Sequence, residues 1–496
     1  MKQQAMNPFL PLNSCIPDGE PHVFDGRAYL YGSHDREGGT RFCELPYEVW
    51  SAPVNDLSDW RCEGVSFRPE WDPSYPQAGT SLFAPDVVQG NDGRYYLYYA
   101  LSGNSFTAPI HVAVSDTPAG PFAYYGVVQN PDGSALTENI TFDPAVFNDN
   151  GRIRLYYGWA LDFAPEKLKH RTPEFEEQLV QAQVMLFGKP EAEVRNSKDG
   201  IMGANEVELA DDMLTVQGPV HRIVPGQADA DGTSFFGHAF FEGSSMRKIG
   251  DTYYFIYSSQ WQHELCYATS QYPDRDFTFG GVLISNGDIG INGRTAEKRL
   301  AATGNNHGSV EYINGQWYVF YHRQTHKNSF NRKACAEKIT LLTDGRFVQA
   351  EMTSCGLNGG PLVAQGTYSA AYACELTDGH MPHIGGNDKL GDAPFPYQAN
   401  EGNEHFIADI DDNTAIGYRY FAFAGKTRLT LTVRGAAGRW EVLTDAAPVC
   451  ELTQPAADGW TKISTTFTAE GTHALRLIYH GSGKAALKDI TLEKAE

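Results

Sequence analysis

Four acidic side chains interrupt apolar runs at matched positions along the chain. Each precedes a glycine of a predicted tight turn by seven or eight residues, and the four acids are Asp18, Asp86, Asp143 and Glu242. Two facing carboxyl groups can protonate a leaving oxygen and activate a water molecule, which is what cleavage of a glycosidic bond requires. A third carboxyl group can keep the proton donor protonated, because like charges resist joint ionisation. A single such acid favours a structural role at a strand end, whereas four at matched offsets favour a shared site.

Each of these acids is followed by a predicted β-hairpin. Aromatic-rich runs follow turns in which glycine stands beside Asn or Asp, at residues 23–33, 90–100, 142–158, 247–259 and 312–323. Gly and Asn tolerate the positive φ angles that tight hairpin turns require. The five turn glycines recur about every 60 residues with one longer interval, and a four-stranded propeller blade with its loops has about that length. The sequence therefore predicts an all-β fold in which residues 1–355 form a five-bladed β-propeller.

The innermost strands of such a propeller line a central channel, so acids at equivalent positions are expected at one height in it. The longer interval contains a helical stretch at 165–183, which we expect to be an insertion between blades. Beyond residue 355 the hairpin signature disappears. Runs that alternate apolar and polar residues follow, which is typical of an antiparallel sandwich with one solvated face on each sheet. Residues 356–496 are therefore predicted to form a β-sandwich domain.

The composition excludes some classes of partner. The chain has 496 residues and a net charge of −22, which repels phosphate backbones and anionic lipids, so neither nucleic acid nor a membrane is an expected partner. No run approaches the roughly 18 apolar residues of a membrane span, and the first residues lack the apolar core of a signal peptide. The eight cysteines form no CxxC pair. We therefore expect reduced thiols and a cytoplasmic location, with the oligomeric state left open.

The acid motifs resemble those of glycoside hydrolase family 43. PDGEPHVFDGRAYLYGSHD is similar to the first-blade motif of that family, TFDPAVFNDNGRIRLYYG to the modulator motif, and FFEGSSMRKIGDTYYFIYSS to the acid motif. The resemblance implies an inverting enzyme in which Asp18 is the base, Glu242 is the acid, and Asp143 positions Glu242 and raises its pKa. The second-blade motif implies a structural role for Asp86. The DGEP sequence stands where many members have Asp-Pro, which leaves Glu20 as a competing base.

The resemblance covers residues 7–350 and includes the fifth blade. TGNNHGSV resembles the segment that carries a histidine, His307, near a bound ion or water in the channel, and YHRQTH resembles the strand that brings an arginine, Arg323, to the pocket. The resemblance implies no required cofactor, but a structural Ca²⁺ in the central channel and a metal contact of His307 are possible. The segment IADIDDNTAIGYRYFAFAG resembles carbohydrate-binding modules of the family 6 type. The second domain is therefore expected either to bind sugar or to buttress the propeller.

Aromatic side chains beside these motifs are candidates for stacking on a sugar ring. They are Phe83, Trp159, Phe235, Phe236 and Trp261, and His34 is a candidate partner for a hydroxyl group. The resemblance and the expected location imply an exo-acting enzyme that releases α-L-arabinofuranosyl or β-D-xylosyl residues from plant-derived (hemicellulose) oligosaccharides. Three alternatives stay open. They are a galactofuranosidase or galactan-acting exo-glycosidase, a retaining enzyme like the related five-bladed fructan hydrolases, and a sugar-binding propeller without catalysis.

Overall fold

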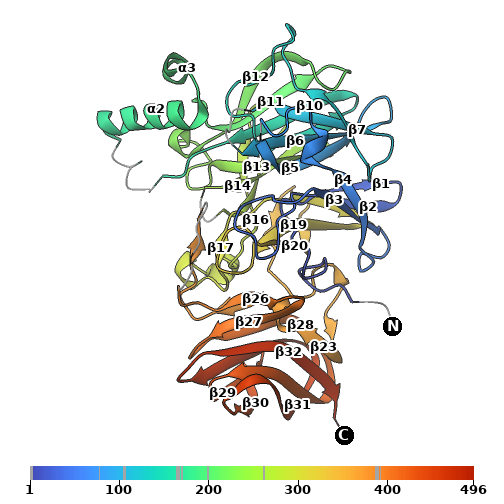
Figure 1. Cartoon of the computed structure of the whole chain (residues 1–496), viewed down its shortest axis with the longest axis vertical. Helices are drawn as coiled ribbons and strands as arrows, with labels where there is room; N and C mark the ends of the chain where they lie inside the picture. The colour runs from blue at the N-terminus through green and yellow to red at the C-terminus, as the bar shows by residue number, and fades with distance from the viewer. Residues whose placement is uncertain are drawn as a thin grey trace.

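The N-terminal part of the protein is a five-bladed β-propeller, as the sequence predicts (Figure 1). The computed structural model describes residues 4–77, 79–103, 108–163, 168, 171–197, 200–260, 263–385, 390 and 393–495. Each blade is a four-stranded antiparallel sheet built from strands that are consecutive in the chain. The first two blades comprise β1 (Glu20–Phe24), β2 (Arg27–Tyr31), β3 (Tyr47–Pro53) and β4 (Arg61–Phe67), then β5 (Gly79–Gln89), β6 (Tyr95–Gly103), β7 (Ile110–Ser115) and β8 (Ala123–Val127).

The other three blades follow the same order from the channel outward. Blade three comprises β9 (Ala145–Asp149), β10 (Arg152–Trp159), β11 (Gly203–Leu209) and β12 (Val216–Pro225). Blade four comprises β13 (Phe240–Ile249), β14 (Thr252–Ser259), β15 (Leu265–Ser270) and β16 (Thr278–Ile284). Blade five comprises β18 (Ser309–Ile313), β19 (Gln316–Gln324), β20 (Arg332–Leu341) and β21 (Phe347–Val348).

The five predicted hairpins are confirmed as the connections between the first and second strands of the blades. Their glycines have φ angles between 61° and 96°, the left-handed region that glycine enters without steric cost, and they are Gly26, Gly93, Gly151, Gly250 and Gly315. The first strands of the blades contact one another in a ring, and β1 meets β18 to close it. A backbone bridge between Gly19 and Gly308 lies at this closure. One apolar cluster fills the gap there, with Ile16 and Leu30 on one side and Ile313 and Phe320 on the other.

The predicted helical insertion is present, but its position differs from the expectation. Helices α2 (Pro173–Phe187) and α3 (Glu191–Asn196) lie between β10 and β11, which belong to one sheet. The insertion is therefore within blade three and not between blades. Helix α2 begins after Thr172, whose hydroxyl accepts a hydrogen bond from the backbone of Phe175, and it ends before Gly188 in the left-handed conformation. Most of residues 165–170, which the sequence assigned to the helix, lie outside the described residues.

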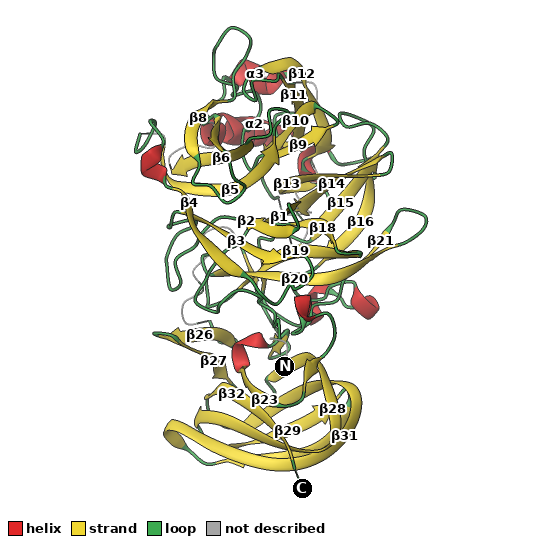
Figure 2. Cartoon of the chain, turned by 90° about the vertical axis from the view of Figure 1, so that its right-hand side faces the viewer, coloured by secondary structure: helices red, strands yellow, loops and turns green. Residues whose placement is uncertain are grey.

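The C-terminal part is a large β-structure around its own core (Figure 2). Its short strands are β22 (Leu362–Val363), β23 (Gly366–Ser369), β24 (Glu375–Thr377) and β25 (His383–Ile384), which pairs with β17 (Thr303–Gly304) of the propeller part. The others are β26 (Tyr397–Glu401), β27 (Glu404–Ile410), β28 (Ala415–Gly435), β29 (Gly438–Thr444), β30 (Ala447–Gln454), β31 (Ala457–Gly481) and β32 (Ala485–Lys494). The boundary near residue 355 falls between β21 and β22 and stays a prediction.

Ion pairs join the two parts of the chain. Arg419 of β28 donates to Asp288 at 2.6 Å and to Glu351 at 2.6 Å, both of which precede the C-terminal strands. The eight cysteines are all free thiols in the structure, in line with the expected absence of a disulfide framework. None of the helices among the described residues is long and apolar enough to cross a membrane.

Candidate active site

Three of the predicted acids meet at one end of the propeller channel. Asp18 and Asp143 lie two residues before the first strands of blades one and three, and Glu242 lies in the first strand of blade four. The ring of His307 lies between two of them, because its Nδ1 is 4.0 Å from Asp18 Oδ1 and 3.8 Å from Asp143 Oδ2. Asp18 and Asp143 are each only 4% exposed. The structure thus places two of the acids beside one buried histidine, and Gly243, the neighbour of Glu242, packs against the same ring.

The backbone around these acids is unusual. Asp18 and Asp143 have φ angles of 57° and 46°, a left-handed conformation that side-chain-bearing residues rarely adopt. Gly243, directly after Glu242, has a φ of 77°, and a Cβ atom there would lie 3.0 Å from Cγ of His307. Strained backbone of this kind persists where the surrounding structure holds it, and it gathers at functional sites. A residue with a Cβ at position 243 would therefore be strained and would crowd the ring of His307.

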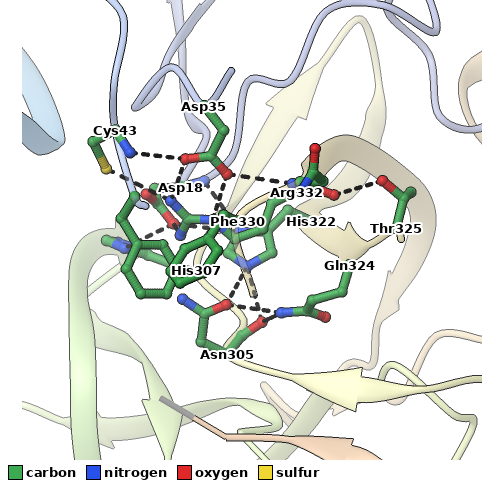
Figure 3. Close-up of polar contacts among 12 residues, drawn as sticks. Asp18, Asp35, Cys43, Asn305, His307, His322, Gln324, Thr325, Phe330 and Arg332 are labelled. Carbon is green, nitrogen blue, oxygen red and sulfur yellow. Dashed lines mark hydrogen bonds and ion pairs between the residues drawn. The ribbon is translucent and has the colours of Figure 1, made fainter. Parts of the chain in front are cut away.

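Asp18 is held by residues from blade five (Figure 3). Nη1 of Arg332 lies 2.8 Å from Asp18 Oδ1, and the backbone N–H of Asp18 donates to Nδ1 of His322 at 3.1 Å. Arg332 is itself fixed, because its Nε and Nη2 bind the two oxygens of Asp35 at 2.9 and 3.0 Å. Burial alone would raise the pKa of Asp18, but effects that favour the carboxylate, of which the charge of Arg332 is the largest, outweigh it and lower the pKa. Asp18 is therefore ionised.

Glu242 has the opposite electrostatic environment. Burial, together with the charge of Asp18, raises the pKa of Glu242 to about 7, although a hydrogen bond from Nε1 of Trp159 to Oε2 at 3.0 Å works against the rise. Burial and the neighbouring charges of Glu242 and Asp18 raise the pKa of Asp143 well above its usual value. Two carboxyl groups with pKa values pushed apart are suited to the roles of base and acid. The site can hold an ionised Asp18 and a protonated Glu242 at the same pH.

The structure adds three residues that the sequence analysis did not single out, namely Asp35, His322 and Arg332. His322 is neutral, since burial lowers its pKa to about 3, and its Nε2 donates to the backbone oxygen of Asn305 at 2.9 Å. This bond leaves Nδ1 free to accept from Asp18. The YHRQTH segment contained the signal for His322, because neighbouring residues of a strand point to opposite faces.

The structure does not bring Arg323 to the acids. Because His322 points into the channel, Arg323 of the same strand points to the opposite face of β19. Its guanidinium donates to the backbone oxygens of Asn7 at 3.1 Å and Ala373 at 3.2 Å, in a buried position between the propeller and the C-terminal part. The arginine that reaches the acids is Arg332, which begins the next strand.

Glu20 and Asp86 have other partners. Glu20 Oε1 lies 2.7 Å from Nη2 of Arg247 and accepts from the hydroxyl of Ser245 at 3.0 Å. Asp86 accepts from the backbone N–H of Val146 at 2.7 Å and contacts His22 at 2.7 Å, which fits the structural role expected of it. Burial raises the pKa of Glu20 to about 7, whereas the pKa of Asp18 is lowered, so Asp18 is the better candidate for an ionised base.

The remaining candidates occupy different surroundings. The ring of Phe83 packs on Phe142 with centroids 5.3 Å apart, and Nδ1 of His34 lies 2.9 Å from the backbone oxygen of Pro46. Phe235 is buried in the core between blades three and four, whereas Phe236 is 65% exposed. Trp261 lies outside the described residues. Of the predicted aromatic residues, the structure thus places Trp159 in direct contact with an acid.

The surroundings of His307 do not by themselves form a calcium site. Ca²⁺ takes six to eight oxygen ligands, whereas His307 offers nitrogen and faces the oxygens of Asp18 and Asp143. Burial lowers the pKa of His307, so the ring is neutral. Calcium in the channel stays a prediction, and the chemistry below does not pass through it.

Comparison with known proteins identifies the family to which the chain belongs. The family model "Glycosyl hydrolases family 43" matches residues 7–173. The chain is 42% identical to a xylosidase/arabinosidase of Thermoclostridium stercorarium over 99% of both chains, and 30% identical to a xylosidase/arabinosidase of Bacteroides ovatus over 69% of this chain and 97% of that one. A crystal structure of a family 43 β-xylosidase/α-arabinofuranosidase from a compost metagenome, in complex with xylotriose, has 27% identity and a TM-score of 0.51, and the match covers 70% of this chain and 98% of that chain. The chain therefore belongs to glycoside hydrolase family 43 and is a glycoside hydrolase.

Proposed function

We propose that the protein is an inverting exo-glycosidase that releases terminal β-D-xylosyl and α-L-arabinofuranosyl residues from oligosaccharides. Asp18 removes a proton from the attacking water, Glu242 protonates the leaving oxygen, and Asp143 positions Glu242. The observation that carries this proposal is the opposite perturbation of two carboxyl groups in one buried site. Arg332 lowers the pKa of Asp18, whereas burial and the charge of Asp18 raise that of Glu242 to about 7.

The sugar specificity rests on the relatives. The full-length relative is named a xylosidase/arabinosidase, and the matching crystal structure carries the names of both activities. An ionised base beside a protonated acid suits both sugars, because each presents an anomeric carbon and a glycosidic oxygen to the same pair. Terminal xylosyl and arabinofuranosyl residues are therefore the substrates to test first.

The proposal is tested with aryl β-D-xylosides, α-L-arabinofuranosides and β-D-galactofuranosides. We expect turnover of the first two, and Asp18→Asn should abolish it, whereas Glu242→Gln should abolish turnover of xylobiose, whose leaving oxygen needs a proton; circular dichroism should show that both variants are folded. Product analysis by ¹H NMR should show the opposite anomer first, and product size on xylo-oligosaccharides should show release of single sugars. Retained configuration would refute the inverting assignment. Sugar binding without turnover of any of the three substrates would favour a binding propeller.

A further inference from the structure

Among the residues that the structure describes, one side chain donates a hydrogen bond to the carboxyl group of Glu242. Nε1 of Trp159 donates to Oε2 at a distance of 3.0 Å. An indole nitrogen is a donor and never an acceptor, so it cannot face an oxygen that points a proton at it. While this bond is in place, the acidic proton of Glu242 is directed to Oε1.

Trp159 is held between the strand of the acid and the helical insertion. The residue after Trp159, Ala160, donates its backbone N–H to the oxygen of Phe241 at 2.8 Å, and Phe241 directly precedes Glu242. On the other side, the ring of Phe187 meets the indole edge-on, with centroids 5.6 Å apart and planes at 74°. Phe187 is the last residue of α2 and is completely buried. The insertion thus reaches the acid through two aromatic rings in contact.

We infer that Trp159 is a positioning residue that selects Oε1 of Glu242 as the proton-delivering oxygen, and that the helical insertion of blade three holds Trp159 in place through Phe187. The inference rests on the proposed function, in which Glu242 is the acid. It assigns the insertion a part in catalysis, although the insertion carries none of the three acids.

The reaction step shows where the hydrogen bond acts. The proton on Oε1 of Glu242 moves to the glycosidic oxygen, and the bond between that oxygen and the anomeric carbon breaks with its electron pair going to the oxygen. Water attacks the same carbon from the opposite face while Asp18 takes its proton. Glu242 becomes a carboxylate during this step, so the bond from Trp159 becomes charge-assisted and strengthens. An interaction stronger in the transition state than before it accelerates the reaction.

The first test varies the leaving group. Trp159→Phe keeps a ring for stacking on the sugar and removes the donor. For xylobiose, whose leaving oxygen needs a proton, kcat/KM should fall about 10- to 100-fold, the size of a hydrogen bond to a charged group. For 2,4-dinitrophenyl β-D-xyloside, whose leaving group departs without protonation, it should fall less than about threefold. Equal losses on both substrates, or a loss confined to KM, would mean that Trp159 only binds sugar and would overturn the inference.

The second readout is the pH profile of kcat/KM. A donor to the carboxylate favours the ionised form and so lowers the pKa of Glu242. Loss of the donor in Trp159→Phe should therefore move the alkaline limb of the profile to higher pH. An unmoved limb would contradict the inference, because a purely structural role leaves the titration of Glu242 unchanged.

The role of the insertion has a matched control in the same helix. Phe187→Ala removes the ring against Trp159, and Phe175→Ala removes a ring that packs on Phe163 at 5.8 Å instead. Phe187→Ala should lower kcat/KM for xylobiose about 2- to 10-fold, the size of one lost aromatic pair, and spare the dinitrophenyl substrate. Phe175→Ala should leave both unchanged. If the two variants behave alike, the insertion does not act through Trp159.

Two further comparisons complete the test. The double variant with Trp159→Phe and Phe187→Ala should lose no more than Trp159→Phe alone, since both act on one contact; additive losses would overturn the coupling. The variant Glu242→Gln distinguishes failure of this inference from failure of the proposed function. If Glu242→Gln is inactive on xylobiose and Trp159→Phe is normal on it, only this inference fails, whereas a Glu242→Gln variant that still hydrolyses xylobiose would refute the proposed function itself.

Discussion

Replacement of Arg332 by methionine should disable the base without removing it. The guanidinium lies 2.8 Å from Asp18 Oδ1, and both groups are buried. Two unit charges at this distance attract by about 6 kcal/mol at an effective dielectric constant of ~20, which is an upper bound. Removal of one partner of a buried ion pair costs about 3–5 kcal/mol in practice. That free energy corresponds to a roughly 10²- to 10⁴-fold change in a protonation equilibrium.

The variant can avoid most of this cost by protonating Asp18. The acid limb of kcat/KM, which requires ionised Asp18, should then move to higher pH. The alkaline limb requires protonated Glu242, whose pKa is about 7. The two limbs approach each other, so the maximum of the profile should fall by about 10²-fold or more, following the cost of the lost ion pair, and higher pH should not restore it. Arg332→Lys keeps a charge but cannot bind Asp18 and Asp35 together, so we expect an intermediate profile.

The assay is the pH profile of kcat/KM on an aryl xyloside between pH 4 and 9, with Arg323→Met as the control. Arg323 is also a buried arginine, but its guanidinium donates to the backbone oxygens of Asn7 and Ala373 and not to a carboxylate of the site. Its replacement should leave both limbs in place. The reasoning is refuted if Arg332→Met keeps the wild-type acid limb and only raises KM, because Arg332 would then bind substrate instead of holding Asp18 ionised.

Three other outcomes follow from the structure. In the wild type, activity should decline as pH rises through about 7, because Glu242 then loses the proton it must donate; a profile that is flat from pH 6 to 9 would contradict this. Gly243→Ala should lower kcat about tenfold, since a side chain is strained at a φ of 77° and its Cβ would lie 3.0 Å from Cγ of His307, so that strand β13 or the His307 ring must shift; unchanged kinetics would show that the site accommodates the methyl group. Arg323→Met should destabilise the protein by about 2–4 kcal/mol through lost buried hydrogen bonds, measured as a lower melting temperature with kcat/KM within about twofold of the wild type.

The parts of the fold that the sequence predicts are those with local physical causes. A glycine at positive φ followed by alternating aromatic residues marks each hairpin, and its five copies predict the blades. The offset between acid and turn glycine predicts Asp18, Asp143 and Glu242, because equivalent positions in successive blades reach equivalent heights. The connection between β10 and β11 carries no such mark. The sequence therefore predicts an insertion between two blades, whereas the helices lie within blade three.

The residues that sequence analysis missed depend on pairing between distant strands. Arg332 lies 314 residues from Asp18, so the sequence around either residue gives no sign of their contact. The choice between His322 and Arg323 depends on which face of β19 is turned to the channel, and a register shift of one residue would exchange them. The segment YHRQTH contains both residues, but the sequence does not show which of them faces the channel. The structure resolves this by placing His322 beside Asp18.

Asp18 and the residues that bind it lie where the first and last blades of the propeller meet. Blade one supplies Asp18, blade five supplies Arg332 and His322, and the backbone bridge between Gly19 and Gly308 lies directly beside them. Every blade is made of consecutive strands, so the first and last blades are held together by non-covalent contacts alone. Parting of these two blades would separate the base from its counter-ion before any single sheet melts. We therefore expect heat to inactivate the enzyme by separating blades one and five. A ligand that binds at their contact should raise the melting temperature.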